Sequence, residues 1–230
     1  MSTMEEYFAF AEKHPELFVN PPSGGFTIIM DEHKIREIEA YMAQKLQARG
    51  QPAEWARVGI AYRDQYVLLV RDAVRLPDGS ADIHIRSVSS ATEVPGVFIL
   101  PVHQGHILLI RHFRHETRTW RLEIPGGFGE PGMSSEQSAR RELKEEIGAT
   151  ITRLIPLGRV HPDTAFRAGH FDLFHAEIES YGEIDVQEGI AEVVSVSVQK
   201  FEWMIRENEI TDMNVLVAYT RAKLRGLFSS

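Results

Sequence analysis

The spacing of hydrophobic positions divides the chain into helical and strand-like stretches. Residues 4–18 and 31–50 carry apolar side chains every three or four positions, which is the spacing of amphipathic helices. Gly50 ends the second run, and the stretch NPPSGG at Asn20–Gly25 separates the two. We therefore expect the first 50 residues to be mainly helical. The clearest helical repeat within them consists of Ile35, Ile38, Met42 and Leu46.

From about Arg57 onwards the spacing becomes that of β-strands. Residues 66–88 contain two β-rich runs on either side of Pro77–Gly79, and residues 96–114 repeat this arrangement around His103–Gly105. Both stretches are typical of β-hairpins. The later strand-like runs are residues 120–125, 152–160, 170–179 and 192–199, and the closing helical runs are residues 200–208 and 212–228.

Strands that surround one central helix, with more helix at both ends, indicate an α+β fold rather than an alternating parallel sheet. We expect a domain boundary near residues 50–57, where helical spacing gives way to strands. Residues 1–55 would then form an N-terminal helical extension. Residues 56–230 would form the main domain, which begins with a β-hairpin region.

Composition excludes several kinds of site and partner. The 230 residues contain no cysteine, which excludes disulfides, thiolate zinc sites and cysteine nucleophiles. A net charge of −8 disfavours nucleic acid as a partner, so a phosphate-bearing ligand would need local arginines or a metal. No apolar run approaches the roughly 20 residues of a membrane span, and no signal peptide is visible. We expect a cytoplasmic protein with no membrane partner.

The central helix is marked by its capping residues. Ser134 is followed three residues later by Gln137, which is the spacing of a capping box, and Gly148 is a natural helix stop. The sequence therefore predicts a helix over about Ser135–Ile147. Ala139, Leu143 and Ile147 recur every four residues and would form its buried stripe.

Three carboxylates share one face of this helix. Glu142, Glu145 and Glu146 are spaced at i, i+3 and i+4, where like charges destabilise a helix by a few tenths of a kcal/mol per pair. One interpretation is a solvated face screened by neighbouring arginines and a lysine. The other is a site for a hard cation such as Mg²⁺ or Mn²⁺. The glycine-rich stretch at residues 125–132 favours the second, because glycine lets backbone carbonyls approach closely.

Residues 126–149 resemble the Nudix box. That pattern is a glycine, five residues, a glutamate, seven residues and then Arg-Glu-aliphatic-any-Glu-Glu-any-Gly-aliphatic. The resemblance implies a Nudix-type α/β/α sandwich with a mixed sheet, here with an N-terminal helical extension. The matching residues are Gly127, Arg141, Glu142, Leu143, Glu145, Glu146 and Gly148, with Ala149 at the last aliphatic position.

One position departs from the pattern, because Met133 stands where the first glutamate of the box belongs. In the family that glutamate supports the junction of loop and helix. Glu130 lies three residues earlier and is an acidic residue common in this loop, so the pattern does not mark it as a relocated glutamate. We still expect metal binding, because the Arg-Glu-x-x-Glu-Glu half of the box is intact.

The resemblance implies hydrolysis of a nucleoside diphosphate linked to another group, with Mg²⁺ or Mn²⁺ as cofactor. Glu142 and Glu146 would bind the metal directly, Glu145 directly or through water, and the Gly126 carbonyl would add a neutral oxygen. Arg141 would orient the carboxylates.

The general base would come from a loop downstream of the box. Among the acids of residues 181–194 we select Glu188, just before a predicted strand. A solvated loop charge is the alternative interpretation for this residue.

Residues 107–127 are similar to the branch that cleaves ADP-ribose and nucleotide sugars. In that branch residues at the positions of Arg114 and Glu123 lie near the nucleotide. The alternative for Arg114 is a surface arginine at a strand end. The branch also commonly forms homodimers through N-terminal strands, a role for which residues 66–88 would serve.

Two other functions stay open. The loss of the first box glutamate at Met133 favours a catalytically weak or inactive protein that binds a nucleotide-diphosphate metabolite as a sensor. A hydrolase of another pyrophosphate, such as a dinucleotide or a coenzyme, is the third candidate.

Overall fold

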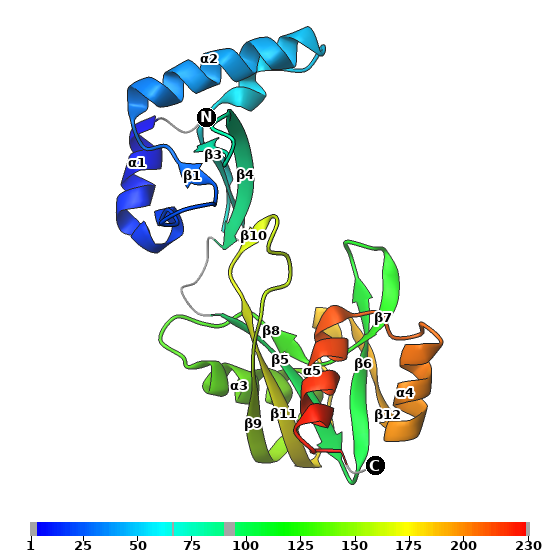
Figure 1. Ribbon diagram of the computed structural model, residues 1–230. Coiled ribbons are helices and arrows are strands. Elements are labelled where there is room, and N and C mark those ends of the chain that lie inside the picture. The colour runs from blue at the N-terminus through cyan, green and yellow to red at the C-terminus, as the bar shows by residue number, and fades with distance from the viewer. Residues whose placement is uncertain (1–3, 66, 90–94, 229–230) are drawn as a thin grey trace. The chain divides into compact units, whose positions relative to one another are not determined.

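The computed structural model describes residues 4–65, 67–89 and 95–228, which belong to two compact units (Figure 1). The first unit contains Met1–Ala91 together with Asp163–Gly169, and the second contains Thr92–Pro162 and His170–Ser230. The sequence predicts a boundary at residues 50–57, and this position falls inside the first unit.

The first unit combines helices with a small sheet. Strands β3 and β4 form the predicted hairpin, paired from Val67 with Ser89 to Arg75 with Ala81. The sheet order is β1-β3-β4-β10, β2 also pairs with β3, and β10 runs parallel to β4. The elements of the unit are α1 (Met4–Lys13), η1 (Pro15–Phe18), β1 (Thr27–Ile28), α2 (Glu32–Ala48), η2 (Ala53–Ala56), β2 (Gly59–Arg63), β3 (Val67–Arg75), β4 (Ala81–Ser89) and β10 (Arg167–Ala168).

The two N-terminal helices share one hydrophobic core with the hairpin. Tyr7 of α1 and Ile35 of α2 are fully buried, in the same cluster as Val70 and Ala73 of β3. Each helix presents one apolar stripe, and that stripe needs a sheet to cover it. This packing explains why the helices and the hairpin form one unit.

The second unit is built on a mixed sheet. Its strand order is β12-β6-β5-β11-β9, with β7 beside β6 and β8 beside β5. Strands β5 and β11 are parallel, and the other strand pairs of this sheet are antiparallel. Its elements are β5 (Gly96–His103), β6 (His106–Arg114), β7 (Thr119–Glu123), β8 (Gly126–Gly127), α3 (Ser135–Ile147), β9 (Thr150–Val160), β11 (Phe171–Ser180), η3 (Val186–Glu188), β12 (Ile190–Ser197), α4 (Val198–Arg206) and α5 (Met213–Leu224).

Helices cover both faces of this sheet (Figure 1). On β6, Leu108 and Ile110 pack in the cluster of α3, whereas Ile107 and Leu109 pack in the cluster of α4 and α5. The alternation follows from the two-residue period of a strand, and it explains the continuous apolar run at this point of the sequence. The predicted α+β class and the α/β/α sandwich are therefore confirmed. None of the described helices has the length and hydropathy needed to cross a membrane.

Candidate active site

Helix α3 begins and ends where its capping residues predict. The Ser134 hydroxyl accepts a hydrogen bond from the Gln137 amide at 3.2 Å, and the Gln137 side chain accepts one from the Ser134 amide at 2.8 Å. Gly148 ends the helix in the left-handed region with φ +60°. The predicted stripe of Ala139, Leu143 and Ile147 is fully buried against the sheet. This packing fixes which face of α3 carries the acidic residues.

The three glutamates of that face differ in their burial. Glu142 is 6% exposed and Glu146 is 2% exposed, whereas Glu145 is exposed. The buried pair lies against β8, where the Gly126 amide donates a hydrogen bond of 3.1 Å to Oε2 of Glu146. A Cβ on Gly127 would lie 2.7 Å from Oε1 of Glu142, so glycine is required for the carboxylate to approach the loop.

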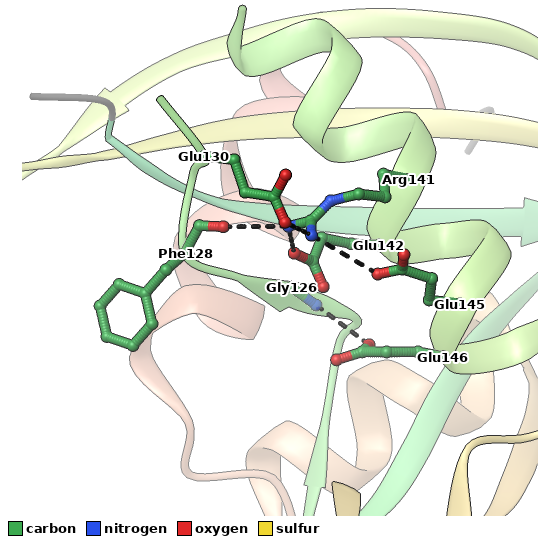
Figure 2. A network of polar contacts seen from close by, with 7 residues as sticks. All are labelled: Gly126, Phe128, Glu130, Arg141, Glu142, Glu145 and Glu146. Atoms are coloured by element: carbon green, nitrogen blue, oxygen red, sulfur yellow. Dashed lines mark hydrogen bonds and ion pairs between the residues drawn. The ribbon is translucent and has the colours of Figure 1, made fainter. Parts of the chain in front are cut away.

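Arg141 is surrounded by carboxylates (Figure 2). Its Nη2 donates to Oε1 of Glu142 at 2.6 Å and to the Phe128 carbonyl at 3.2 Å. Its Nη1 pairs with Glu130 and lies 3.8 Å from Oε2 of Glu145. One guanidinium therefore joins the loop to the acidic face of the helix.

This arrangement leaves an excess of negative charge. The pKa of Glu146 is raised to about 9, mainly by burial and then by the nearby charges of Glu142 and Glu188. Burial likewise raises the pKa of Glu142 to about 7, against the opposing effect of Arg141. The site is therefore prepared to take up a proton or a cation.

The loop that carries Glu188 is attached to the end of α3. The Gly182 amide donates to the Ile147 carbonyl at 2.9 Å, and the Asp185 amide donates to the Glu146 carbonyl at 3.2 Å. Glu188 itself is exposed at the end of η3, and its charge acts on both buried glutamates of α3. The structure thus brings Glu188 to the acidic face that the sequence singles out.

Arg114 and Glu123 form an ion pair on neighbouring strands. Nε and Nη2 of Arg114 lie 2.8 and 2.5 Å from Oε2 of Glu123, which is 6% exposed. The charge of Arg114 also acts on Glu146 and lowers its pKa. The two predicted substrate residues therefore lie together and electrostatically close to the carboxylate face.

His112 belongs to the same region, and the sequence analysis did not select it. Its Nδ1 lies 4.0 Å from Oε2 of Glu123, and its ring hydrogen-bonds to the backbone of Glu188. The side chain is 8% exposed, and burial lowers its pKa. The available signal was its position on β6, two residues after Ile110, which faces α3. A histidine that continues an apolar strand face toward a helix is a candidate for the site.

Comparison with known proteins decides the family. The sequence profile of the NUDIX domain matches residues 92–215, which is more than half of the chain. The chain belongs to the Nudix family. An ADP-ribose pyrophosphatase of Bacillus subtilis (strain 168) is 30% identical over 164 residues, which cover 69% of this chain and 85% of that protein.

A second sequence relative and a solved structure are also similar to this chain. The ADP compounds hydrolase NudE of Escherichia coli (strain K12) is 39% identical over 57 residues, which cover 25% of this chain and 31% of that protein. A solved structure described as an ADP compounds hydrolase superposes with a TM-score of 0.63 at 22% identity. It covers 74% of this chain and 93% of that one, and at this identity the likeness establishes the fold.

The donor set of the Nudix hydrolase suits a hard divalent cation. Two buried carboxylates have raised pKa values, and Arg141 pairs with one of them, Glu142. Oxygen ligands of this kind are those that Mg²⁺ and Mn²⁺ prefer. As they stand, no three carboxylate or imidazole groups of the described residues converge on one metal position. Glu142 is turned toward Arg141, Glu146 toward the Gly126 amide, and Glu145 lies at the exposed side of Arg141. For a cation to contact all three, Glu145 and Glu146 would have to turn toward Glu142.

Proposed function

We propose that this Nudix hydrolase cleaves the diphosphate of ADP-ribose or a related nucleotide sugar into two phosphomonoesters, with Mg²⁺ or Mn²⁺ as cofactor. The observation that carries the proposal is the pair of buried carboxylates, Glu142 and Glu146, held against a glycine loop, with Arg141 paired to Glu142. The substrate class is supported by the Bacillus subtilis ADP-ribose pyrophosphatase, of which the chain spans 85%.

Glu142 and Glu146 would hold the cation, with Glu145 beside them and the Gly126 carbonyl as a neutral ligand. A bound divalent cation neutralises charge on the diphosphate and increases the acidity of water. Its arrival also relieves the repulsion between glutamates that adds to the effect of burial in raising the pKa of both carboxylates. Arg141 keeps the Glu142 carboxylate beside the loop through its 2.6 Å hydrogen bond.

The reaction joins the oxygen of a water molecule to one phosphorus and breaks the bond from that phosphorus to the bridging oxygen. We assign to the Glu188 carboxylate the removal of the water proton, because its exposed side chain ends the loop that docks on α3. Arg114 would pair with a phosphate or stack on the base, since a guanidinium suits both contacts. Glu123 holds that guanidinium by two hydrogen bonds before the substrate arrives.

We also propose that the hydrolase acts as a homodimer joined through N-terminal strands. On one side β4 pairs with β3 along its whole length, and on the other β10 pairs with Ser87 and Val88 alone. Among the described residues, Ala81–Arg86 therefore form an open strand edge, which can accept a strand from a second chain. Analytical ultracentrifugation tests this assembly.

A substrate panel tests the activity. The protein is incubated with Mg²⁺ or Mn²⁺ and with ADP-ribose, ADP-sugars, a dinucleotide or a coenzyme, and the phosphomonoester released is measured. We expect turnover of ADP-ribose or an ADP-sugar. Turnover should fall by at least about a hundredfold in Glu146→Gln, because losing even an outer partner of a metal ligand lowers metal affinity or activity 10- to 100-fold. Glu136→Gln is the matched control, since Glu136 is 59% exposed and pairs with Arg140.

Two results would replace this proposal. Tight binding of ADP-ribose without turnover under either metal would support the sensor function that Met133 favours. Turnover confined to the dinucleotide or the coenzyme would keep the site and change the substrate class.

A further inference from the structure

We propose that Glu130 is a positioning residue, which fixes the guanidinium of Arg141 so that Arg141 holds the Glu142 carboxylate in place for the cation. The inference rests on the proposed function, because it assumes that Glu142 is a metal ligand. It gives a role in the site to a residue that the box pattern does not require.

The two ends of the guanidinium bind different partners (Figure 2). Nη1 pairs with Glu130 of the loop, whereas Nη2 donates to Glu142 at 2.6 Å and to the Phe128 carbonyl at 3.2 Å. A guanidinium is planar, so a carboxylate on one nitrogen and a carboxylate and a carbonyl on the other set its orientation. Glu130 and Phe128 together therefore attach Arg141 to the loop.

Partial burial strengthens the pairing of Arg141 with Glu142 more than its pairing with the half-exposed Glu130. The Arg141 side chain is 25% exposed and the Glu142 side chain 7%, although Glu130 is half exposed. Without Glu130, Nη1 would turn to Glu145, which already lies 3.8 Å away. Arg141 would then neutralise two of the three carboxylates of the acidic face, and it would compete with the cation for them.

The loop geometry explains how Glu130 can act although it stands three residues before the expected position. The Met133 amide donates a hydrogen bond of 3.1 Å to the Glu130 carbonyl, which closes a turn between the two residues. Gly132 within the turn has φ +85°, a conformation that favours glycine. The turn thus places Glu130 beside the loop–helix junction, where Met133 supplies no carboxylate.

Mn²⁺ affinity, measured by electron paramagnetic resonance on the substrate-free protein, tests the inference without relying on turnover. We expect Glu130→Gln to weaken Mn²⁺ binding by about tenfold, as the loss of partners of metal ligands does elsewhere. The control is Glu136→Gln, which also removes one negative charge, from the first turn of α3, but breaks a pair with Arg140 at 2.9 Å. Equal affinities for Glu130→Gln and Glu136→Gln would overturn the inference.

A double-mutant cycle shows whether Glu130 acts through Arg141. Glu130→Gln should lower kcat with little change in KM in the native protein, and should have little further effect in Arg141→Gln. Effects that multiply independently would overturn the inference and leave the proposed function intact. Absence of Mn²⁺ binding to the native protein would instead overturn both the metal site and the role of Glu130.

Discussion

The main-chain nitrogen of Gly126 lies 3.1 Å from Oε2 of Glu146, a carboxylate that is 2% exposed. A single neutral hydrogen bond does not compensate for the burial of a charged carboxylate. The pKa of Glu146 is therefore raised to about 9, mainly by burial and then by the charges of Glu142 and Glu188. In the absence of metal the folded protein holds a proton here at neutral pH.

The metal-free protein should accordingly lose stability as the pH rises. Glu146 and Glu142 have folded-state pKa values of about 9 and about 7, against 4.5 for a free carboxyl. Their contribution to folding stability is complete below pH 4.5, because both states are then protonated. Above pH 4.5 it is lost progressively, up to about pH 7 for Glu142 and about pH 9 for Glu146, because the unfolded chain releases protons that the folded chain retains. The free energy of unfolding then falls by about 1.4 kcal/mol per pH unit for each proton that the folded chain retains.

Urea unfolding in EDTA between pH 5 and 9 measures this dependence. Other groups titrate in this range, so the informative quantity is the difference between the native protein and Glu146→Gln. We expect the free energy of unfolding of the native protein to fall more steeply with pH than that of Glu146→Gln, by up to the slope that one retained proton gives. We also expect Mn²⁺ to restore stability at high pH in the native protein alone. Parallel curves for the two proteins would show that Glu146 is already ionised.

The capping residues and the apolar repeat were sufficient to predict α3 and its acidic face. Ser134, Gln137 and Gly148 act locally, and their spacing contains the information that sets the ends of the helix. The difference between the buried Glu146 and the exposed Glu145 is not local. It depends on where β8 passes, and the spacing of the three glutamates on one helical face does not contain that position.

The partners that come from other segments show the same limit. Glu130 binds Arg141 because a turn brings the loop back onto the helix, and nothing in the box pattern distinguishes this from a solvated acid. His112 follows a continuous apolar run, in which the face that points at α3 is defined only by the packed sheet. The division of the chain into units also depends on packing. Residues 50–57 mark a change of secondary structure, whereas the shared core lies across it.

Glu188→Gln should separate chemistry from metal binding. Loss of a general base costs about 10²- to 10⁴-fold in rate, so kcat should fall by at least about a hundredfold. Mn²⁺ affinity should fall much less, because Glu188 influences Glu142 and Glu146 through charge. Steady-state kinetics and Mn²⁺ titration on the same sample provide the comparison.

Glu183→Gln on the same exposed loop is the matched control for this experiment. It removes one negative charge and should leave kcat close to the native value. If Glu183→Gln and Glu188→Gln reduce kcat equally, the loop acts through its overall charge and Glu188 is not the base.

Met133→Glu should give little gain in activity. Glu130 already supplies the loop carboxylate that pairs with Arg141, so a second acid at the junction adds a repulsive neighbour as well as a partner. We expect kcat/KM to rise by less than about tenfold, which corresponds to about 1.4 kcal/mol of barrier. A larger increase, measured with the best substrate of the panel, would show that the native methionine limits catalysis.

In the first unit, Arg86 and Asp72 form a buried ion pair that holds the N-terminal segment on the sheet. Nε of Arg86 lies 2.7 Å from Oδ2 of Asp72, and its Nη1 donates to the Leu17 carbonyl at 2.6 Å. Tyr7 donates to Oδ1 of Asp72 at 2.7 Å, and Asp72 is 2% exposed. One side chain therefore connects β4 with β3 and with η1.

Arg86→Met should destabilise the first unit by about 3–5 kcal/mol, because it leaves the buried Asp72 without its cation. Hydrogen exchange of the β3 and β4 amides, followed by mass spectrometry, reports on this unit separately from the second.

Arg75→Met is the control, because Arg75 is exposed and donates to the Gly79 carbonyl, so its loss should change stability by no more than about 0.5 kcal/mol. Removing both charges in Asp72→Leu with Arg86→Met should recover much of the loss, since no unpaired charge then stays buried. Equal exchange rates in Arg86→Met and Arg75→Met would show that the pair does not hold the segment.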